Sequence, residues 1–417
     1  MSGTIATKLL SRCAGRPVRP GEIVTVEPDR VMSHDNTAFV LEHFLLTGAT
    51  KVWDPDKVVV AFDHCVPAID PRHAQNHADA RAFVAEQGIT RFFDAGVGVC
   101  HQLMCEQGLA LPGQLVLGAD SHSTLYGALN AFGVPINRTE MAGIWATGTI
   151  WLKVPEAIRV VLEGELRPGV SAKDAVLKLL RDLRADGATY RSLEFAGEGV
   201  ATLSIASRMT LANMAVELGA KAGVFPCDAA TRAYLAGRTS EAWEPVGPDP
   251  DARYEREVRL DLSALQPQVA RPHEVDNVTD LGEVRGVKVH QAYLGSCTNG
   301  RLEDLEVAAR ILGGRQVKPG VRLVIYPASS EVQREAEAAG VLDALVAAGG
   351  ELMSASCGPC FGAVGATLQA GEVCISSSNR NFCGRMGSPE AQVYLASPAV
   401  VAASCLAGEI ADPRDYL

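Results

Sequence analysis

The stretch Val58-Val59-Val60-Ala61-Phe62 ends directly at Asp63-His64, so that an acidic and a basic side chain follow a continuous apolar run. Continuous apolar runs of this length are typical of strands that are covered on both faces of a parallel sheet. Polar groups directly after such strands are where open α/β sheets place ligands. Helical patterns alternate with these runs, and the sequence therefore predicts an α/β fold of α/β/α layers with mainly parallel sheets. Similar runs occupy residues 114–118, 323–327 and 373–376.

Length and composition limit the class of protein. A chain of 417 residues is too long for one ordinary core, and we expect α/β domains at residues 1–155, 156–280 and 281–417. The net charge of −11 argues against a general nucleic-acid binder, which needs a basic face. Since no long apolar stretch or signal-peptide pattern is present and eleven cysteines are too sparse for a disulfide scaffold, we expect a soluble, cytoplasmic protein with reduced thiols.

Three cysteines carry the strongest chemical signal. Cys297 lies in Gly295-Ser296-Cys297-Thr298-Asn299-Gly300-Arg301, and the pair Cys357-Gly358-Pro359-Cys360 follows later in the chain. Two cysteines in this spacing can bind one metal centre, and a third thiolate completes a set of three. Iron–sulfur clusters normally take four thiolates, so a set of three leaves one iron open for Lewis-acid chemistry. Spacing alone leaves a zinc site open as well, because several histidines could supply a fourth ligand.

Histidines and arginines stand beside the ends of the predicted strands and helices. His64, His101 and His122 each lie close in sequence to an apolar segment, and a neighbouring carboxylate favours the imidazolium form near neutral pH. Arg380 and Arg385 follow residues 373–376 in a loop rich in glycine and serine. A guanidinium binds a carboxylate through two parallel hydrogen bonds, which suits an acidic substrate. The alternative is that these side chains are ordinary core or surface groups.

The order of these motifs, together with Ser378-Asn379-Arg380-Asn381-Phe382 and Gly384-Arg385, resembles the aconitase superfamily. Within it, the chain is similar to the large subunits of 3-isopropylmalate dehydratase and of homoaconitase. The resemblance implies a [4Fe–4S] cluster on Cys297, Cys357 and Cys360, with one open iron. It also implies a hydro-lyase that acts on a 2-hydroxy dicarboxylate or tricarboxylate. The default substrate is 2-isopropylmalate in leucine biosynthesis, and the alternatives are homocitrate or homoaconitate, citramalate and 2,3-dimethylmalate.

The resemblance also implies roles for single residues. Asp63 and His64 would form the acid pair that protonates the leaving hydroxyl. His101, Asp120 and His122 would hydrogen-bond water or hydroxide at the cluster, with Glu217 of the middle domain near the same water. Without the resemblance, Glu217 would be interpreted as an exposed helix carboxylate. The substrate-side set is His34, Ser121, Asn299, Asn379, Arg380 and Arg385.

Two departures from the family pattern bear on substrate and partner. In residues 132–140, Pro135, Asn137, Arg138 and Glu140 stand where the family has glycines, small residues and an aspartate. This change could reshape the pocket or an interface. The chain also ends at Leu417 without the swivelling domain that supplies a serine base in single-chain aconitases. The resemblance therefore implies a separate small subunit that carries the swivel domain and the catalytic serine.

Two other classes of function remain as alternatives at this stage. One is a regulator that binds RNA after cluster loss, which the net charge of −11 disfavours. The other is a zinc-bearing interaction protein without catalysis, which would be colourless, whereas an iron–sulfur protein is brown.

Overall fold

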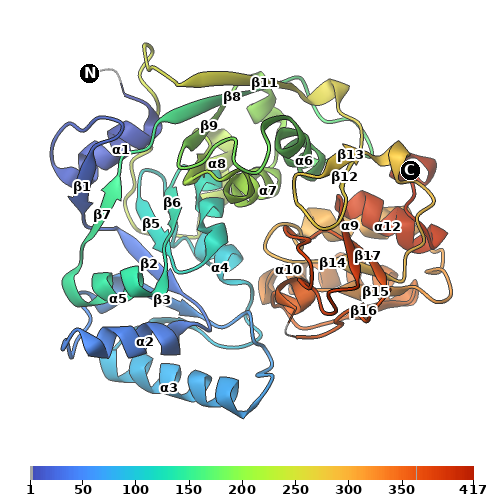
Figure 1. Ribbon diagram of the computed structural model, residues 1–417, viewed down its shortest axis with the longest axis horizontal. Coiled ribbons are helices and arrows are strands. Elements are labelled where there is room, and N and C mark those ends of the chain that lie inside the picture. Colours follow the sequence, from blue (N-terminus) through green and yellow to red (C-terminus); the bar gives the residue numbers. More distant parts are fainter. Residues whose placement is uncertain (1–2, 363) are drawn as a thin grey trace. The chain divides into compact units, whose positions relative to one another are not determined.

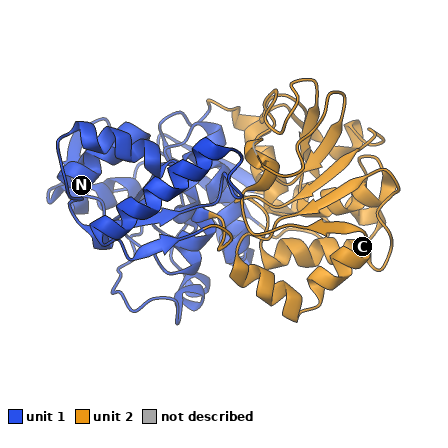
Figure 2. Cartoon of the chain, turned by 90° about the horizontal axis from the view of Figure 1, so that it is seen from below, with its two compact units in different colours: residues 1–94, 100–163, 187–260 blue, residues 95–99, 164–186, 261–417 orange. Residues whose placement is uncertain are grey.

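The structure is a computed structural model that describes residues 3–362 and 364–417. The chain forms two compact units, coloured separately in Figure 2. Unit 1 comprises Met1–Asp94, Cys100–Glu163 and Gly187–Leu260, and unit 2 comprises Ala95–Val99, Gly164–Asp186 and Asp261–Leu417. This division into two units does not test the three domain ranges expected from the sequence, which remain a prediction.

The first sheet of unit 1 has five strands in the order β4-β3-β2-β5-β6, all of them parallel. The middle strand pairs on both sides, with Val31 opposite Val58 and Leu117. Apolar side chains bury both faces, and α2, α3 and α5 lie beside this sheet (Figure 1). The strands are β2 (Arg30–Ser33), β3 (Val58–Ala61), β4 (Arg91–Phe93), β5 (Leu115–Gly118) and β6 (Phe132–Pro135); the helices are α2 (Thr37–Leu46), α3 (Pro71–Gln87) and α5 (Arg138–Thr147).

Unit 1 also contains a four-stranded sheet of order β10-β9-β8-β11 and an antiparallel pair, β1 with β7. Strands β8, β9 and β10 run parallel. Their bounds are β1 (Ile23–Val26), β7 (Ile150–Lys153), β8 (Ala157–Glu163), β9 (Ser192–Ala196), β10 (Ala222–Val224) and β11 (Arg256–Asp261). The helical segments are α1 (Ile5–Ala14), α4 (Cys100–Glu106), η2 (Ser121–Leu129), α7 (Ile205–Asn213), η4 (Met214–Leu218) and α8 (Ala229–Leu235).

Unit 2 is built on a seven-stranded sheet of order β13-β12-β18-β17-β14-β15-β16. The five strands from β18 to β16 are parallel, and β12 and β13 join one edge in antiparallel pairing. Helices α9 and α12 pack against each other, and the core runs through Leu294, Ile325, Ile375 and Val400. The bounds are β12 (Gln268–Ala270), β13 (Val278–Asp280), β14 (Gln291–Leu294), β15 (Arg322–Ile325), β16 (Gly350–Leu352), β17 (Val373–Ser376), β18 (Gln392–Leu395), α6 (Ala172–Leu183), α9 (Leu302–Leu312), α10 (Ser330–Ala338), α11 (Val341–Ala347) and α12 (Pro398–Ala407).

The predicted fold class is confirmed: helices and mainly parallel sheets form α/β layers. The four apolar runs expected as strands correspond to β3, β5, β15 and β17. Glu217 lies in η4, a short helical segment that directly follows α7. Among the described residues, no helix is both long enough and apolar enough to cross a membrane.

Candidate active site

The histidines and carboxylates of unit 1 gather at one edge of the five-stranded sheet. His34 directly follows β2, Asp63 and His64 follow β3, and Asp120 follows β5. Because these three strands are adjacent and parallel, their carboxyl ends meet at the same edge. The backbone therefore brings together residues that are far apart in the sequence.

Asp120 is the centre of this group, because its two oxygens face different histidines. Its Oδ1 lies 2.7 Å from His101 Nε2 and accepts a hydrogen bond from the backbone N–H of His122 at 2.8 Å. Its Oδ2 lies 3.5 Å from His64 Nε2 and 3.9 Å from His34 Nε2. Burial by itself would raise the pKa of Asp120, but hydrogen bonds from the surrounding histidines hold the pKa well below its ordinary value. Asp120 is therefore a carboxylate that is fixed among imidazoles.

Asp63 and His64 form a close pair. His64 Nδ1 lies 2.7 Å from Asp63 Oδ1, and Asp63 Oδ2 accepts a hydrogen bond from the backbone N–H of Cys100 at 2.7 Å. Burial would lower the pKa of His64, but the charge of Asp63 and the hydrogen bonds of Asp120 and Asp63 raise the pKa well above its ordinary value. His64 is thus an imidazolium at neutral pH, with the ring of His34 stacked on it at 4.1 Å between centroids.

His101 is in the opposite protonation state. It is buried, and burial lowers its pKa more than the hydrogen bond and charge of Asp120 raise it. Its Nδ1 lies 3.0 Å from the hydroxyl of Tyr126. The same carboxylate therefore faces one histidine that is charged and one that is neutral. Two titratable groups whose environments drive their pKa values apart are typical of a site that needs both an acid and a base.

Glu217 and His122 extend the network. His122 Nε2 lies 2.8 Å from Glu217 Oε1, and both side chains are buried. The interpretation of Glu217 as an exposed helix carboxylate is therefore wrong. Ser121 Oγ lies 3.3 Å from His122 Nδ1. The structure thus brings together every site residue that was expected in unit 1, namely His34, Asp63, His64, His101, Asp120, Ser121, His122 and Glu217.

Asp35 supports the network, although no role for it was predicted. Its Oδ2 accepts hydrogen bonds from the backbone N–H groups of Asp63 and His64, both at 2.8 Å. Its Oδ1 accepts one from Cys65 N–H at 3.0 Å and lies 2.8 Å from His77 Nε2. Asp35 therefore orients the turn that carries the acid pair. A signal existed, since Asp35 follows β2 as closely as the acid pair follows β3.

His34, Asp35, Asp63 and His64 also lie close enough to one another to suggest a metal-ion site. However, both carboxylates already accept hydrogen bonds from backbone amides through the same oxygens that a cation would need. The arrangement is therefore explained by hydrogen bonding within the chain.

The cysteines gather at the corresponding edge of the sheet in unit 2. Cys297 follows β14, and Cys357 and Cys360 follow β16. Asn379 and Arg380 follow β17, which pairs with β14 on one side, whereas β15 separates β14 from β16 on the other. All three cysteines are buried. The parallel strands therefore bring the predicted ligands and the predicted substrate loop to the same edge.

Hydrogen bonds fix the cysteine loops. The side-chain amide of Asn379 donates to Cys297 Sγ at 3.2 Å, and its Oδ1 accepts from Cys360 Sγ at 3.4 Å. Arg301 donates to the backbone carbonyl of Cys297 at 2.7 Å. The hydroxyl of Tyr293 donates to the carbonyl of Cys357 at 3.0 Å. Asn379 is therefore a bridge between two of the three thiols.

The spacing of the thiols tests which metal centre they fit. Ligands of one tetrahedral zinc ion, each at about 2.3 Å, lie within about 4 Å of one another. In the described part of the chain, Cys297, Cys357 and Cys360 do not form a group whose sulfurs all lie within 4.8 Å. An amide donor on a cysteine sulfur is one of the contacts that tune iron–sulfur clusters.

The remaining site residues of unit 2 lie around these loops. Asn299 is buried, and its amide donates to Asp304 Oδ1 at 3.0 Å. Arg380 and Arg385 are half-buried. The guanidinium of Arg385 lies 5.6 Å from the ring centroid of Phe361, and its buried Nε has no hydrogen-bond partner among the described residues. Such a donor is available to an anionic ligand.

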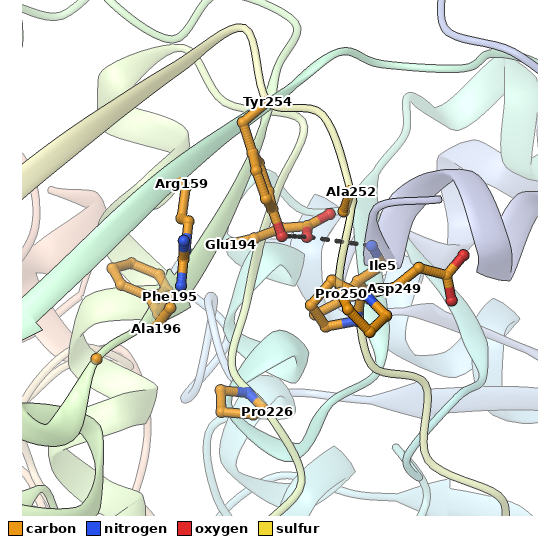
Figure 3. Close-up of a pocket in the computed structure, with 12 residues that line it drawn as sticks. Ile5, Arg159, Glu194, Phe195, Ala196, Pro226, Asp249, Pro250, Ala252 and Tyr254 are labelled. Atoms are coloured by element: carbon orange, nitrogen blue, oxygen red, sulfur yellow. Dashed lines mark hydrogen bonds between the residues drawn. The ribbon is translucent and has the colours of Figure 1, made fainter. Parts of the chain in front are cut away.

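A separate cavity of about 390 Å³ lies in unit 1 (Figure 3). Glu194 lines it, and its carboxylate accepts hydrogen bonds from the N–H groups of Ile5 and Ala6, the first residues of α1, and from the Tyr254 hydroxyl. Asp249, which also lines it, pairs with Lys8. These charged groups are used for folding, so the cavity does not compete with the histidine network as the centre of chemistry.

Comparisons with known proteins show which family the chain resembles. The model of the aconitase family (aconitate hydratase) matches residues 8–286 and 282–408. The chain is 50% identical to the 3-isopropylmalate dehydratase large subunit 1 of Methanopyrus kandleri, over 100% of both chains. It is 48% identical to the homoaconitase large subunit of Thermus thermophilus, over 100% of this chain and 98% of the relative.

A solved structure supports the fold independently. The holo-form of aconitase X from Thermococcus kodakaraensis matches with a TM-score of 0.50 and 12% identity, over 91% of this chain and 90% of that one. Identity this low concerns the fold alone, whereas the family model and the full-length relatives concern descent. On this evidence, the chain belongs to the aconitase family.

Proposed function

We propose that the chain is the large subunit of a [4Fe–4S] hydro-lyase that moves a hydroxyl group within a 2-hydroxy acid by removing and adding water. 2-Isopropylmalate is the first substrate to test, because relatives that are 43–50% identical over the full length are named 3-isopropylmalate dehydratase large subunits. Homocitrate or homoaconitate is the alternative, since the Thermus thermophilus relative is named a homoaconitase large subunit. Citramalate and 2,3-dimethylmalate complete the range.

The single observation that carries the proposal is the Asp120 network. It holds a charged His64 and a neutral His101 on the two oxygens of one buried carboxylate. Elimination of water requires a group that protonates the departing hydroxyl and groups that hold the resulting water. In this assignment, His64 donates the proton from Nε2, because Asp63 holds its Nδ1. His101, Asp120, His122 and Glu217 hold the water.

Cys297, Cys357 and Cys360 would hold the cluster, with Asn379 donating to Cys297 Sγ. When bound, the cluster would supply a Lewis-acidic iron for the substrate hydroxyl. Arg380 and Arg385 would bind the substrate carboxylates, and the buried Nε of Arg385 supports this role. His34, Ser121 and Asn299 would complete the substrate side.

The base that takes the proton from carbon is assigned to a separate small subunit. The relatives are named large subunits, which supports a partner chain. We propose that this partner carries the swivel domain and the catalytic serine. The chain alone is then expected to be nearly inactive even with an intact cluster.

The test is purification without oxygen, together with the candidate small subunit, followed by assays on a panel of 2-hydroxy dicarboxylates and tricarboxylates. The expected result is a brown complex with the highest kcat/KM for 2-isopropylmalate, and almost no turnover by the chain alone. A cluster-bearing complex that acts on no member of the panel would reject the proposal. Colourless, zinc-loaded protein would support the interaction protein, and tight RNA binding by the apo-protein at physiological salt would support the regulator.

A further inference from the structure

Lys173 is a fully buried lysine that the proposed reaction does not use. It is the second residue of α6, which begins after the N-cap Ser171, and its side chain has no exposed surface. Lysine is almost never fully buried unless it is paired, because removing an ammonium from water is costly. Its position in unit 2 therefore requires a compensating interaction.

The ammonium of Lys173 is held by the loop that precedes the site residues. Its Nζ donates to the carbonyl oxygen of Ser377 at 2.9 Å and to that of Ser378. Asn379, the amide that bridges Cys297 and Cys360, is the next residue along the chain. Lys173 thus fixes the backbone from which the bridging amide extends.

The same loop is tied to the turn that carries Cys297. Ser377 Oγ accepts a hydrogen bond from the backbone N–H of Gly295 at 3.0 Å and lies 3.1 Å from the carbonyl oxygen of Gly295. It also lies 3.3 Å from the carbonyl of Asn299. One buried lysine, one serine and one asparagine therefore connect α6 to both segments that carry the cysteines.

Charge gives a second reason to connect Lys173 with the cysteines. Burial lowers the pKa of Lys173 to about 7, and the thiols of Cys360 and Cys297 act most strongly in the opposite direction. These sulfurs therefore lie within electrostatic range of the amine. Thiolates bound to iron would carry negative charge at these sites and would favour the protonated form of Lys173, and the resulting ammonium would favour both the thiolates and an added electron.

We propose that Lys173 is a positioning residue for the metal centre: it holds the Ser377–Ser378 carbonyls so that the Asn379 amide donates to Cys297 Sγ, and it supplies positive charge that offsets the thiolates. This inference rests on the proposed cluster and goes beyond it, since it assigns retention and reduction potential of the cluster to a residue outside the ligand set.

The test compares Lys173→Met, Lys173→Gln and Lys173→Arg with the control Lys178→Met. Lys178 lies on the same helix, is partly exposed and pairs with Asp182. Each variant is reconstituted as the full chain without oxygen. The measurements are iron and sulfide content, the rate of cluster loss to a chelator, and the reduction potential, none of which depends on turnover. Circular dichroism checks folding.

Lys173→Met is expected to lose the cluster roughly 10–100-fold faster, the usual effect of removing a residue that supports metal ligands. Its reduction potential should become more negative, whereas Lys173→Arg and the control should remain near the wild type. Lys173→Gln keeps a donor without the charge, so a wild-type potential in this variant would overturn the electrostatic role. If Lys173→Met does not fold, the comparison of Gln with Arg decides.

Unchanged cluster loss and potential in folded variants would overturn the inference and leave the proposed function standing. A wild-type chain that never takes up iron and sulfide would overturn both.

Discussion

The sheet edge of unit 1 and the sheet edge of unit 2 follow the same construction rule but hold their functional groups differently. Both place polar residues after the carboxyl ends of adjacent parallel strands. In unit 1, imidazoles and carboxylates neutralise and orient one another, as His64 does with Asp63. In unit 2, side-chain donors bind the carbonyls of Cys297 and Cys357, the Asn379 amide donates to one sulfur, and a buried lysine binds the neighbouring Ser377 carbonyl. The first edge is preorganised by its own charges, whereas the second is ordered mainly by hydrogen bonds to backbone carbonyls.

The largest expected effect comes from a substitution at the sheet edge of unit 2 that leaves the edge of unit 1 intact. Cys357→Ala should abolish cluster binding and turnover, because Cys297 and Cys360 cannot retain the cluster with two thiolates. Iron and sulfide analysis of protein prepared without oxygen is the measurement. Cys383→Ala, at an exposed cysteine, is the control and should keep its cluster. Near-stoichiometric iron and sulfide in Cys357→Ala would show that the ligand assignment is wrong.

The next largest effect comes from a substitution at the sheet edge of unit 1 that leaves the cysteines of unit 2 intact. His64→Ala should keep the cluster but lower turnover by about 10²–10⁴-fold, the usual contribution of one general acid. His73→Ala is the matched control, since His73 also pairs with an aspartate, Asp70, but is partly exposed in the first turn of α3. The assay uses the complex with the small subunit. Turnover at the wild-type level in His64→Ala would show that His64 has only a structural role.

A pH experiment sharpens the contrast. The charge of Asp63 raises the pKa of His64, so the protonated ring is stabilised in the fold. This contribution is complete below the ordinary histidine pKa and is lost as pH rises through the raised value. Asp63→Asn should therefore move the alkaline loss of kcat/KM to lower pH. An NMR titration of His64 should show the same shift, and an unchanged alkaline limb would mean that another group limits activity.

The smallest effect concerns the unusual segment before α5. Asn137 accepts a hydrogen bond from Glu140 N–H at 2.9 Å, and the Glu140 carboxylate accepts one from Asn137 N–H at 2.8 Å. This capping box indicates a role in helix stability, so Asn137→Ala should lower the free energy of unfolding by about 0.5–2 kcal/mol. Denaturant titration measures it, with Thr147→Ala at the other end of α5 as the control.

The departure of this segment from the family pattern instead suggests a role in substrate choice. That hypothesis requires the double variant Asn137→Gly and Glu140→Asp to change the ratio of kcat/KM for 2-isopropylmalate and a smaller hydroxy acid. Given the capping box, we expect the ratio to stay constant while stability falls.

The sequence predicts what depends on local pattern. Strand β3 and its terminal acid pair follow from a continuous apolar run. Strand β6 was missed because its residues, Phe132–Pro135, include a glycine and a proline, which strands rarely contain.

The roles of the other residues could not be predicted, because they depend on contacts between residues that are distant in the sequence. Asp35 acquires its role from amides 28–30 positions later, and Tyr126 from a ring on α4. Lysine is the kind of residue expected at a solvated helix position. Lys173 is buried because α6 packs inside unit 2. Glu217 was identified through family resemblance, because its burial arises from the packing of η4 against η2.

The two oxygens of Asp120 face His101 and His64, so protonation of one ring is coupled to protonation of the other. A proton gained by either ring changes the field at the carboxylate and therefore the proton affinity of the other ring. The group takes up and releases protons as one body, with macroscopic constants that belong to the set. The low-pH and high-pH limits of activity would then be properties of the whole network. Neither limit could be assigned to a single histidine.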